Sequence, residues 1–175
     1  FNVSFCHDGH VLGDATGQDP SLDNVVVWKV ESAEKVACLD GRRPVVAPKG
    51  DRVALHRKLP ARGASTDARI RFVAAVCEIP SGTEICKIDR ASRYTRVLAF
   101  SQDSSLLLLA GDGDRIHVFD ASLGKEIALL RSGTATEAAA FSKGDRCLSL
   151  LSVEELTVLN LEGVTRARRE AASPR

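Results

Sequence analysis

The segment FSQDSSLLLLAGDGDRIHVFDASLGKEIALL, Phe100 to Leu130, carries the pattern that decides the fold. It begins with Phe-Ser and then alternates short apolar runs with turns rich in Asp, Ser and Gly. The apolar runs are four to six residues long and rich in Val, Ile, Leu and Phe. Runs of this length and composition are typical of β-strands. The segment therefore predicts several short strands joined by tight turns.

The same order of features recurs along the chain. The next copy, FSKGDRCLSLLSVEELTVLNLEG from Phe141 to Gly163, also begins with Phe-Ser, and less regular copies span Phe5 to Leu39 and Val45 to Ile88. The closing dipeptides of the four copies lie 49, 42 and 40 residues apart: Trp28-Lys29, Cys77-Glu78, Phe119-Asp120 and Leu159-Asn160. A period of about 40 residues with four short strands per repeat is typical of β-propeller blades.

The turn after each closing dipeptide supports the same period. Another apolar strand begins seven residues after the dipeptide in the first three copies, at Val36, Ile85 and Ile127. Gly82 and Gly124 occupy the same place in this turn. A tight hairpin needs a residue there that tolerates a positive φ.

The prediction is an all-β chain of about four four-stranded antiparallel blades that form part of a larger propeller. A blade lies between two others, so its strands are apolar on both faces, as Leu106 to Leu109 and Val25 to Trp28 are. The predicted blades are residues 1–42, 43–92, 93–133 and 134–165, followed by a basic tail at 166–175. A row of four blades leaves one apolar sheet face uncovered on the first blade and one on the last. The remaining blades are therefore expected from further sequence or from another chain.

These residues resemble the WD-repeat family of propellers, with degenerate repeats. The best match is Phe100 to Leu130, where Phe119-Asp120 stands in the place of the family's Trp-Asp pair. Trp28-Lys29 keeps the Trp and loses the Asp, and the family's Gly-His dipeptide is absent. The resemblance implies a rigid disc that holds several proteins at once and seldom catalyses a reaction.

Composition excludes several other classes of protein. Lys and Arg number 24 against 23 Asp and Glu, whereas nucleic-acid-binding domains are far more basic. The longest apolar run, Phe72 to Cys77, is short beside the roughly 20 residues of a membrane span. The five cysteines are odd in number and form no C-x-x-C pair, which favours free thiols in a reducing, cytoplasmic setting over a disulfide framework.

Few motifs point to chemistry. His7-Asp8-Gly9-His10 could begin a metal site, but it falls at a hairpin turn without a third ligand cluster. Asp112-Gly113-Asp114 lacks the rest of a calcium loop, so a strand-connecting turn is expected. Phosphate-binding and nucleophile-elbow motifs are missing from the sequence. No catalytic residue, metal ligand or cofactor is predicted.

Two insertions are predicted to be surface loops, Gly13 to Asn24 and Arg57 to Arg69. The second is basic, and it is the predicted protein-contact loop. Its candidate contact residues are Arg57, Lys58, Arg62 and Arg69. Trp28 is predicted to pack between blades, the alternative being an anchor at an interface.

The predicted function is that of a non-catalytic scaffold that binds other proteins within a larger assembly. Two alternatives stay open. One is an enzyme on a propeller, of the hydrolase or quinoprotein type, and the other is a sensor module of a larger signalling protein.

Overall fold

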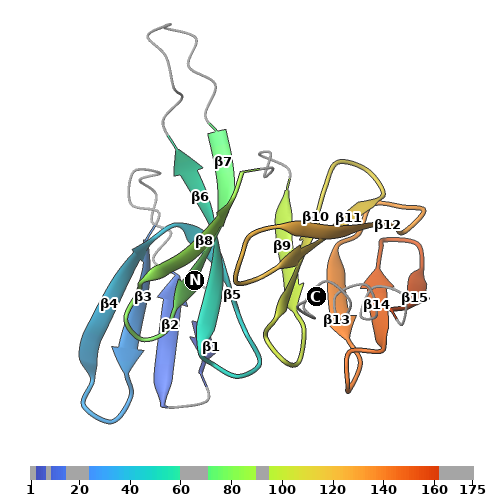
Figure 1. Cartoon of the computed structure of the whole chain (residues 1–175). Coiled ribbons are helices and arrows are strands. Elements are labelled where there is room, and N and C mark those ends of the chain that lie inside the picture. The colour runs from blue at the N-terminus through green and yellow to red at the C-terminus, as the bar shows by residue number, and fades with distance from the viewer. Residues whose placement is uncertain (1–2, 7–8, 15–23, 60–70, 90–94, 162–175) are drawn as a thin grey trace, which may run out of the picture.

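The computed structural model in Figure 1 describes residues 3–6, 9–14, 24–59, 71–89 and 95–161. Every regular element in these ranges is a β-strand, and the strands form four antiparallel sheets. Sheet 1 contains β1 (Val3–Phe5), β2 (His10–Asp14), β3 (Asn24–Lys29) and β4 (Glu34–Asp40). Sheet 2 contains β5 (Arg42–Val46), β6 (Arg52–Leu59), β7 (Arg71–Glu78) and β8 (Glu84–Ile88). Sheet 3 contains β9 (Arg96–Phe100), β10 (Leu106–Ala110), β11 (Arg115–Asp120) and β12 (Glu126–Arg131). Sheet 4 contains β13 (Ala138–Phe141), β14 (Cys147–Leu151) and β15 (Leu156–Asn160).

Each sheet is built from one continuous stretch of chain, and its strands pair in sequence order. Figure 1 shows the sheets following one another from blue to red, with β5 beside sheet 1, β9 beside sheet 2 and β13 beside sheet 3. This is the predicted all-β architecture of stacked propeller blades. Sheet 4 shows three strands within the described part of the chain, and the predicted basic tail at 166–175 lies outside it.

The closing dipeptides end the third strand of their sheets, at Lys29, Glu78, Asp120 and Asn160. The turn that follows confirms the glycine prediction, because Gly82 has a φ of 74° and Gly124 a φ of 64°. Ala33 occupies the same place in sheet 1 with a φ of 53°. The side chain of Asp120 stabilises its turn by accepting the backbone N–H groups of Ser122 and Leu123, at 2.8 and 3.0 Å.

The repeated Phe-Ser dipeptide has a physical reason. The hydroxyl of Ser101 accepts the N–H of Leu106 at 2.8 Å, and that of Ser142 accepts the N–H of Cys147 at 2.9 Å. Each serine thereby closes the hairpin between the first two strands of its sheet. The preceding Phe100 and Phe141 are buried.

Three apolar clusters lie between the sheets, one at each junction. Strand β10 contributes side chains to two of these clusters. Leu107 and Leu109 belong to the cluster shared with sheet 2, whereas Leu106 and Leu108 belong to the cluster shared with sheet 4. All four side chains are buried, because neighbouring residues in a strand point to opposite faces and both faces are covered.

The structure corrects the predicted bounds of the two loops. Arg57 and Lys58 lie within β6, where they pair with Val73 and Phe72 of β7, so the hairpin extends into the predicted loop. Gly13 likewise lies in β2. The rest of the two insertions, residues 15–23 and 60–70, lies outside the described residues, as does His7 of the His-x-x-His motif.

Candidate protein-interaction surfaces

One row of three residues crosses each sheet at its closing dipeptide. In sheets 2, 3 and 4 this row packs against the preceding sheet. We call the side of a sheet that carries this row its N-side face, and the opposite side its C-side face. The N-side rows are Val46–Val53–Cys77, Phe100–Leu107–Phe119 and Phe141–Leu148–Leu159. The members of these rows are buried, apart from Val46 and Leu159, which are half-buried.

The equivalent row of sheet 1 is Phe5–Val11–Trp28. Phe5 is 79 % exposed and Trp28 is 42 % exposed. Within the described residues Trp28 is therefore not enclosed between two sheets, and its packing between blades stays a prediction. Trp28 occupies the position that would pack against a preceding sheet, and among the described residues no sheet precedes sheet 1. Val3, on the same face, is also exposed.

Sheet 4 leaves the opposite face bare. In every sheet a valine stands directly before the closing dipeptide and points to the C-side face: Val27, Val76, Val118 and Val158. The first three are at most 1 % exposed, whereas Val158 is 60 % exposed. Leu151 and Leu156 pair with each other on the same face and are exposed as well. The described part of the chain thus ends in two exposed apolar surfaces.

The turn glycines mark how closely neighbouring sheets approach. A Cβ placed on Gly124 would lie 3.0 Å from the carbonyl oxygen of Lys87 in β8. Polar contacts join the same neighbours, because Arg52 of sheet 2 donates to the Ser122 hydroxyl of sheet 3 at 3.0 Å. Asp145 of sheet 4 accepts the N–H of Gln102 of sheet 3 at 2.8 Å.

Arg57, a predicted contact residue, binds other groups of the same chain. Its Nη1 donates to Glu84 Oε2 at 2.6 Å, and its Nε donates to the carbonyl oxygen of Asp40 at 2.8 Å. Its side chain is 13 % exposed. Because Asp40 belongs to β4 and Arg57 to β6, this arginine ties sheet 1 to sheet 2. Lys58 is half-buried in β6.

The other two predicted contact residues, Arg62 and Arg69, lie outside the described residues. The contact loop as a whole therefore stays a prediction.

A pocket of about 250 Å³ lies at one end of sheet 3, and Thr95, Leu109, Arg115 and His117 are among its lining residues. His117 points away from the face of Ile116 and Val118, and its Nδ1 lies 3.4 Å from Glu126 Oε1. Across the described ranges, no group of three or more His, Cys, Asp or Glu side chains could hold a metal ion.

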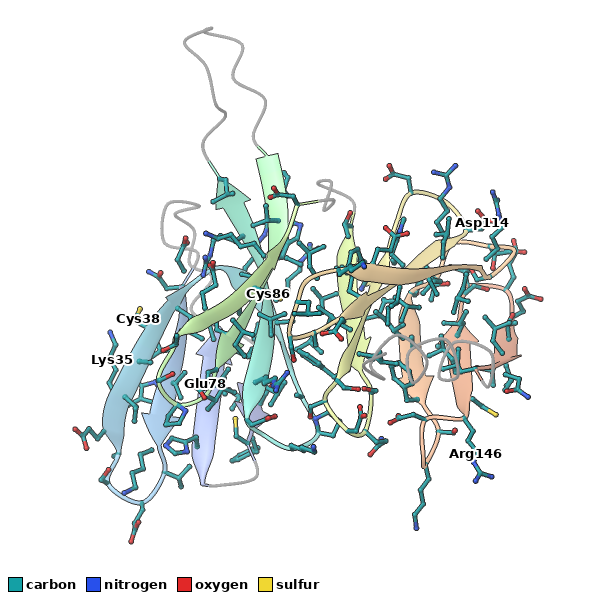
Figure 2. The ribbon with its side chains drawn as sticks, in the orientation of Figure 1. Lys35, Cys38, Glu78, Cys86, Asp114 and Arg146 are labelled. Atoms are coloured by element: carbon teal, nitrogen blue, oxygen red, sulfur yellow. The ribbon has the colours of Figure 1, made fainter. Side chains whose placement is uncertain are left out.

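All five cysteines are free thiols. Burial, together with the nearby carboxylates of Asp120 and Glu84, raises the pKa of Cys86 from 9.0 to about 11. Burial also raises the pKa of Cys77, against the opposing charge of Arg57. Cys38 lies exposed on the edge strand β4, whereas Cys86 lies on β8 beside sheet 3 (Figure 2).

In the described part of the chain, no helix is long and apolar enough to cross a membrane. No protein-family model matches the sequence, and no curated protein matches it. Solved structures do match. One of them, titled "Crystal structure of the eukaryotic initiation factor", is 15 % identical with a TM-score of 0.59. The match covers 91 % of this chain and 40 % of that one, so this chain spans less than half of the similar structure. At this identity the likeness shows the fold: an all-β, propeller-like arrangement of four antiparallel sheets.

Proposed function

We propose that this chain is a non-catalytic, WD-repeat-like propeller module that binds other proteins and acts as a scaffold within a larger cytoplasmic assembly. The observation that carries the proposal is the pair of bare sheet faces. Phe5 and Trp28 at one end, and Leu156 and Val158 at the other, are exposed at positions that the inner sheets bury.

Burial of these side chains is energetically favourable. Covering one large apolar side chain contributes about 1.5–3 kcal/mol, and contiguous exposed apolar surface of this kind marks sites of protein association. The remaining blades of the propeller, supplied by further sequence or by another chain, are one class of partner for these faces. Other proteins then bind the completed module.

Site-specific photo-crosslinking tests this proposal in cells. A photoreactive amino acid replaces Phe5 or Leu156, one on each bare face, and Leu123 serves as the control because it is 74 % exposed in the turn between β11 and β12. We expect strong crosslinks to a defined set of polypeptide segments from Phe5 and Leu156, and weak ones from Leu123. Equal, weak crosslinking at all three positions would contradict the proposal.

An enzyme on the same fold would hold a metal or a cofactor at its site, or turn over a substrate. Elemental analysis and the absorption spectrum of the protein purified from its source check the first two. Stoichiometric metal or a cofactor absorption band would favour the enzyme alternative over the scaffold.

A further inference from the structure

The three sheet-to-sheet junctions are built in the same way. The N-side row of the later sheet meets apolar side chains from the second, third and fourth strands of the earlier sheet. These C-side sets are Leu12, Val27 and Leu39 in sheet 1, Ala54, Val76 and Ile88 in sheet 2, and Leu108, Val118 and Leu130 in sheet 3. Each junction thus joins one N-side face to one C-side face, and no junction joins two faces of the same kind.

Among the residues that the structure describes, one face of each kind is left unmatched. Sheet 1 presents an N-side row with two exposed aromatic side chains, Phe5 and Trp28. Sheet 4 presents a C-side face on which Val158 takes the place of Val27 in sheet 1, and on which Leu151 and Leu156 are also exposed. An inner junction shows that an aromatic N-side row packs well on an aliphatic C-side face, because Phe100 and Phe119 of sheet 3 pack against Ala54 and the other aliphatic side chains of sheet 2.

We propose that a second copy of this chain covers these faces, with the C-side face of sheet 4 in one copy packed on the N-side face of sheet 1 in the other. This inference rests on the proposed function, since it names the partner of the same bare faces. Two such contacts related by a twofold axis cover the exposed faces of sheet 1 and sheet 4 in both copies. The described parts of the two copies together contain eight sheets, which lies within the usual range of about four to eight blades for propellers.

The proposed contact joins two different faces, the N-side face of sheet 1 and the C-side face of sheet 4. Two variants, one on each face, test this pairing. Phe5→Glu places a charge on the N-side face, and Val158→Glu places one on the C-side face. Both side chains are exposed in the single chain, so each variant should fold with an unchanged circular dichroism spectrum. Leu123→Glu, at an exposed position in a turn, is the control.

Sedimentation velocity over a wide range of concentrations measures the association. We expect the wild-type chain and Leu123→Glu to form dimers, and Phe5→Glu and Val158→Glu each to be monomeric alone. A mixture of these two variants should associate again, because the intact sheet 4 of Phe5→Glu fits the intact sheet 1 of Val158→Glu. With one contact in place of two, the mixed pair should dissociate about 100-fold or more readily than the wild-type dimer.

Trp28 is the only tryptophan in the chain, so its fluorescence reports the N-side face directly. Its emission should shift to shorter wavelength as the wild-type chain associates. Monomers at every concentration, with Trp28 emission typical of solvent exposure, would overturn the proposal. So would a Val158→Glu variant that still forms dimers, since this would pair like faces. If the chain is monomeric while Phe5 and Leu156 crosslink to other polypeptides, this inference fails and the proposed function stands.

Discussion

Gly82, in the turn between β7 and β8, lies against Leu39 of β4 in the preceding sheet. A Cβ placed on Gly82 would come within 2.8 Å of Leu39 Cδ2, and the φ of Gly82 is 74°. Two independent requirements therefore select glycine at this position: the left-handed backbone and the close approach of the neighbouring sheet. The repeat period located this residue in the sequence, and the junction between sheets gives it a second role.

We expect Gly82→Ala to lower the free energy of unfolding by about 2 kcal/mol or more, because an L-residue at this φ costs about 1–2 kcal/mol and Leu39 must also move. Gly113→Ala is the matched control, since Gly113 has a φ of 71° and a Cβ placed on it would meet no atom within 4 Å. Urea denaturation measures both. Equal losses in the two variants would show that the contact with Leu39 contributes nothing.

Ala33 is expected to be a position where glycine stabilises the fold. It occupies the place of Gly82 in sheet 1 with a φ of 53°. Relief of this backbone strain outweighs the larger entropy of glycine in the unfolded chain, so Ala33→Gly should gain about 0.5–1 kcal/mol in urea denaturation. Ala135→Gly, at an exposed alanine outside the strands, should instead lose stability. A loss at Ala33 would mean that the turn is not strained.

The sequence was sufficient to predict the four sheets and their turns, because each repeat carries its own local signals. Ser101 and Ser142 close equivalent hairpins, and Gly82 and Gly124 have the positive φ that their place requires. Such signals depend only on residues close together in the chain, so a single sequence reveals them.

The sequence could not reveal which faces are covered. Trp28 and Phe119 occupy equivalent places and look alike in the repeat, yet Phe119 is buried and Trp28 is exposed. The difference lies in the neighbouring sheet, not in the residue. Arg57 was assigned to a loop for a related reason, because its basic surroundings suggested one. In the structure Arg57 pairs with Val73 and belongs to β6. Its side chain donates hydrogen bonds to Glu84 and to the carbonyl oxygen of Asp40.

Replacement of Arg57 should weaken the junction between sheets 1 and 2. Arg57→Lys keeps the charge but cannot reach Glu84 Oε2 and the carbonyl oxygen of Asp40 together. We expect a loss of about 1–3 kcal/mol, because partly buried acceptors then lose their donor. Arg146→Lys, at an exposed arginine, should stay within about 0.5 kcal/mol of the wild type. Equal effects of the two substitutions on the urea midpoint would contradict this role.

The cysteines should differ in reactivity towards iodoacetamide. Cys38 is exposed and should be alkylated first in the folded protein. Cys86, with a pKa of about 11, holds only about 0.1 % thiolate at pH 8, and its thiol donates to the carbonyl oxygen of Ala121 at 3.4 Å. Peptide mapping by mass spectrometry should show Cys86 modified only after unfolding. Modification of Cys86 as fast as Cys38 would contradict its burial.

The same thiol makes stability depend on pH. Folding raises the pKa of Cys86 from 9.0 to about 11, so the folded state binds this proton more tightly than the unfolded state. The resulting stabilisation is complete below pH 9.0 and is lost as the pH rises to about 11. Cys86→Ala should flatten this part of the profile of unfolding free energy against pH. An unchanged slope in the variant would assign the loss to other groups.

Two-sided burial of the sheets is the claim on which the rest depends, and neighbouring leucines in β10 test it most directly. Leu107 packs towards sheet 2 and Leu108 towards sheet 4, and each is at most 1 % exposed. Urea denaturation of Leu107→Ala and Leu108→Ala should show a loss of about 2–5 kcal/mol for both. A large loss for one and almost none for the other would mean that one face of sheet 3 is open to solvent, and the stacked-blade account would be wrong.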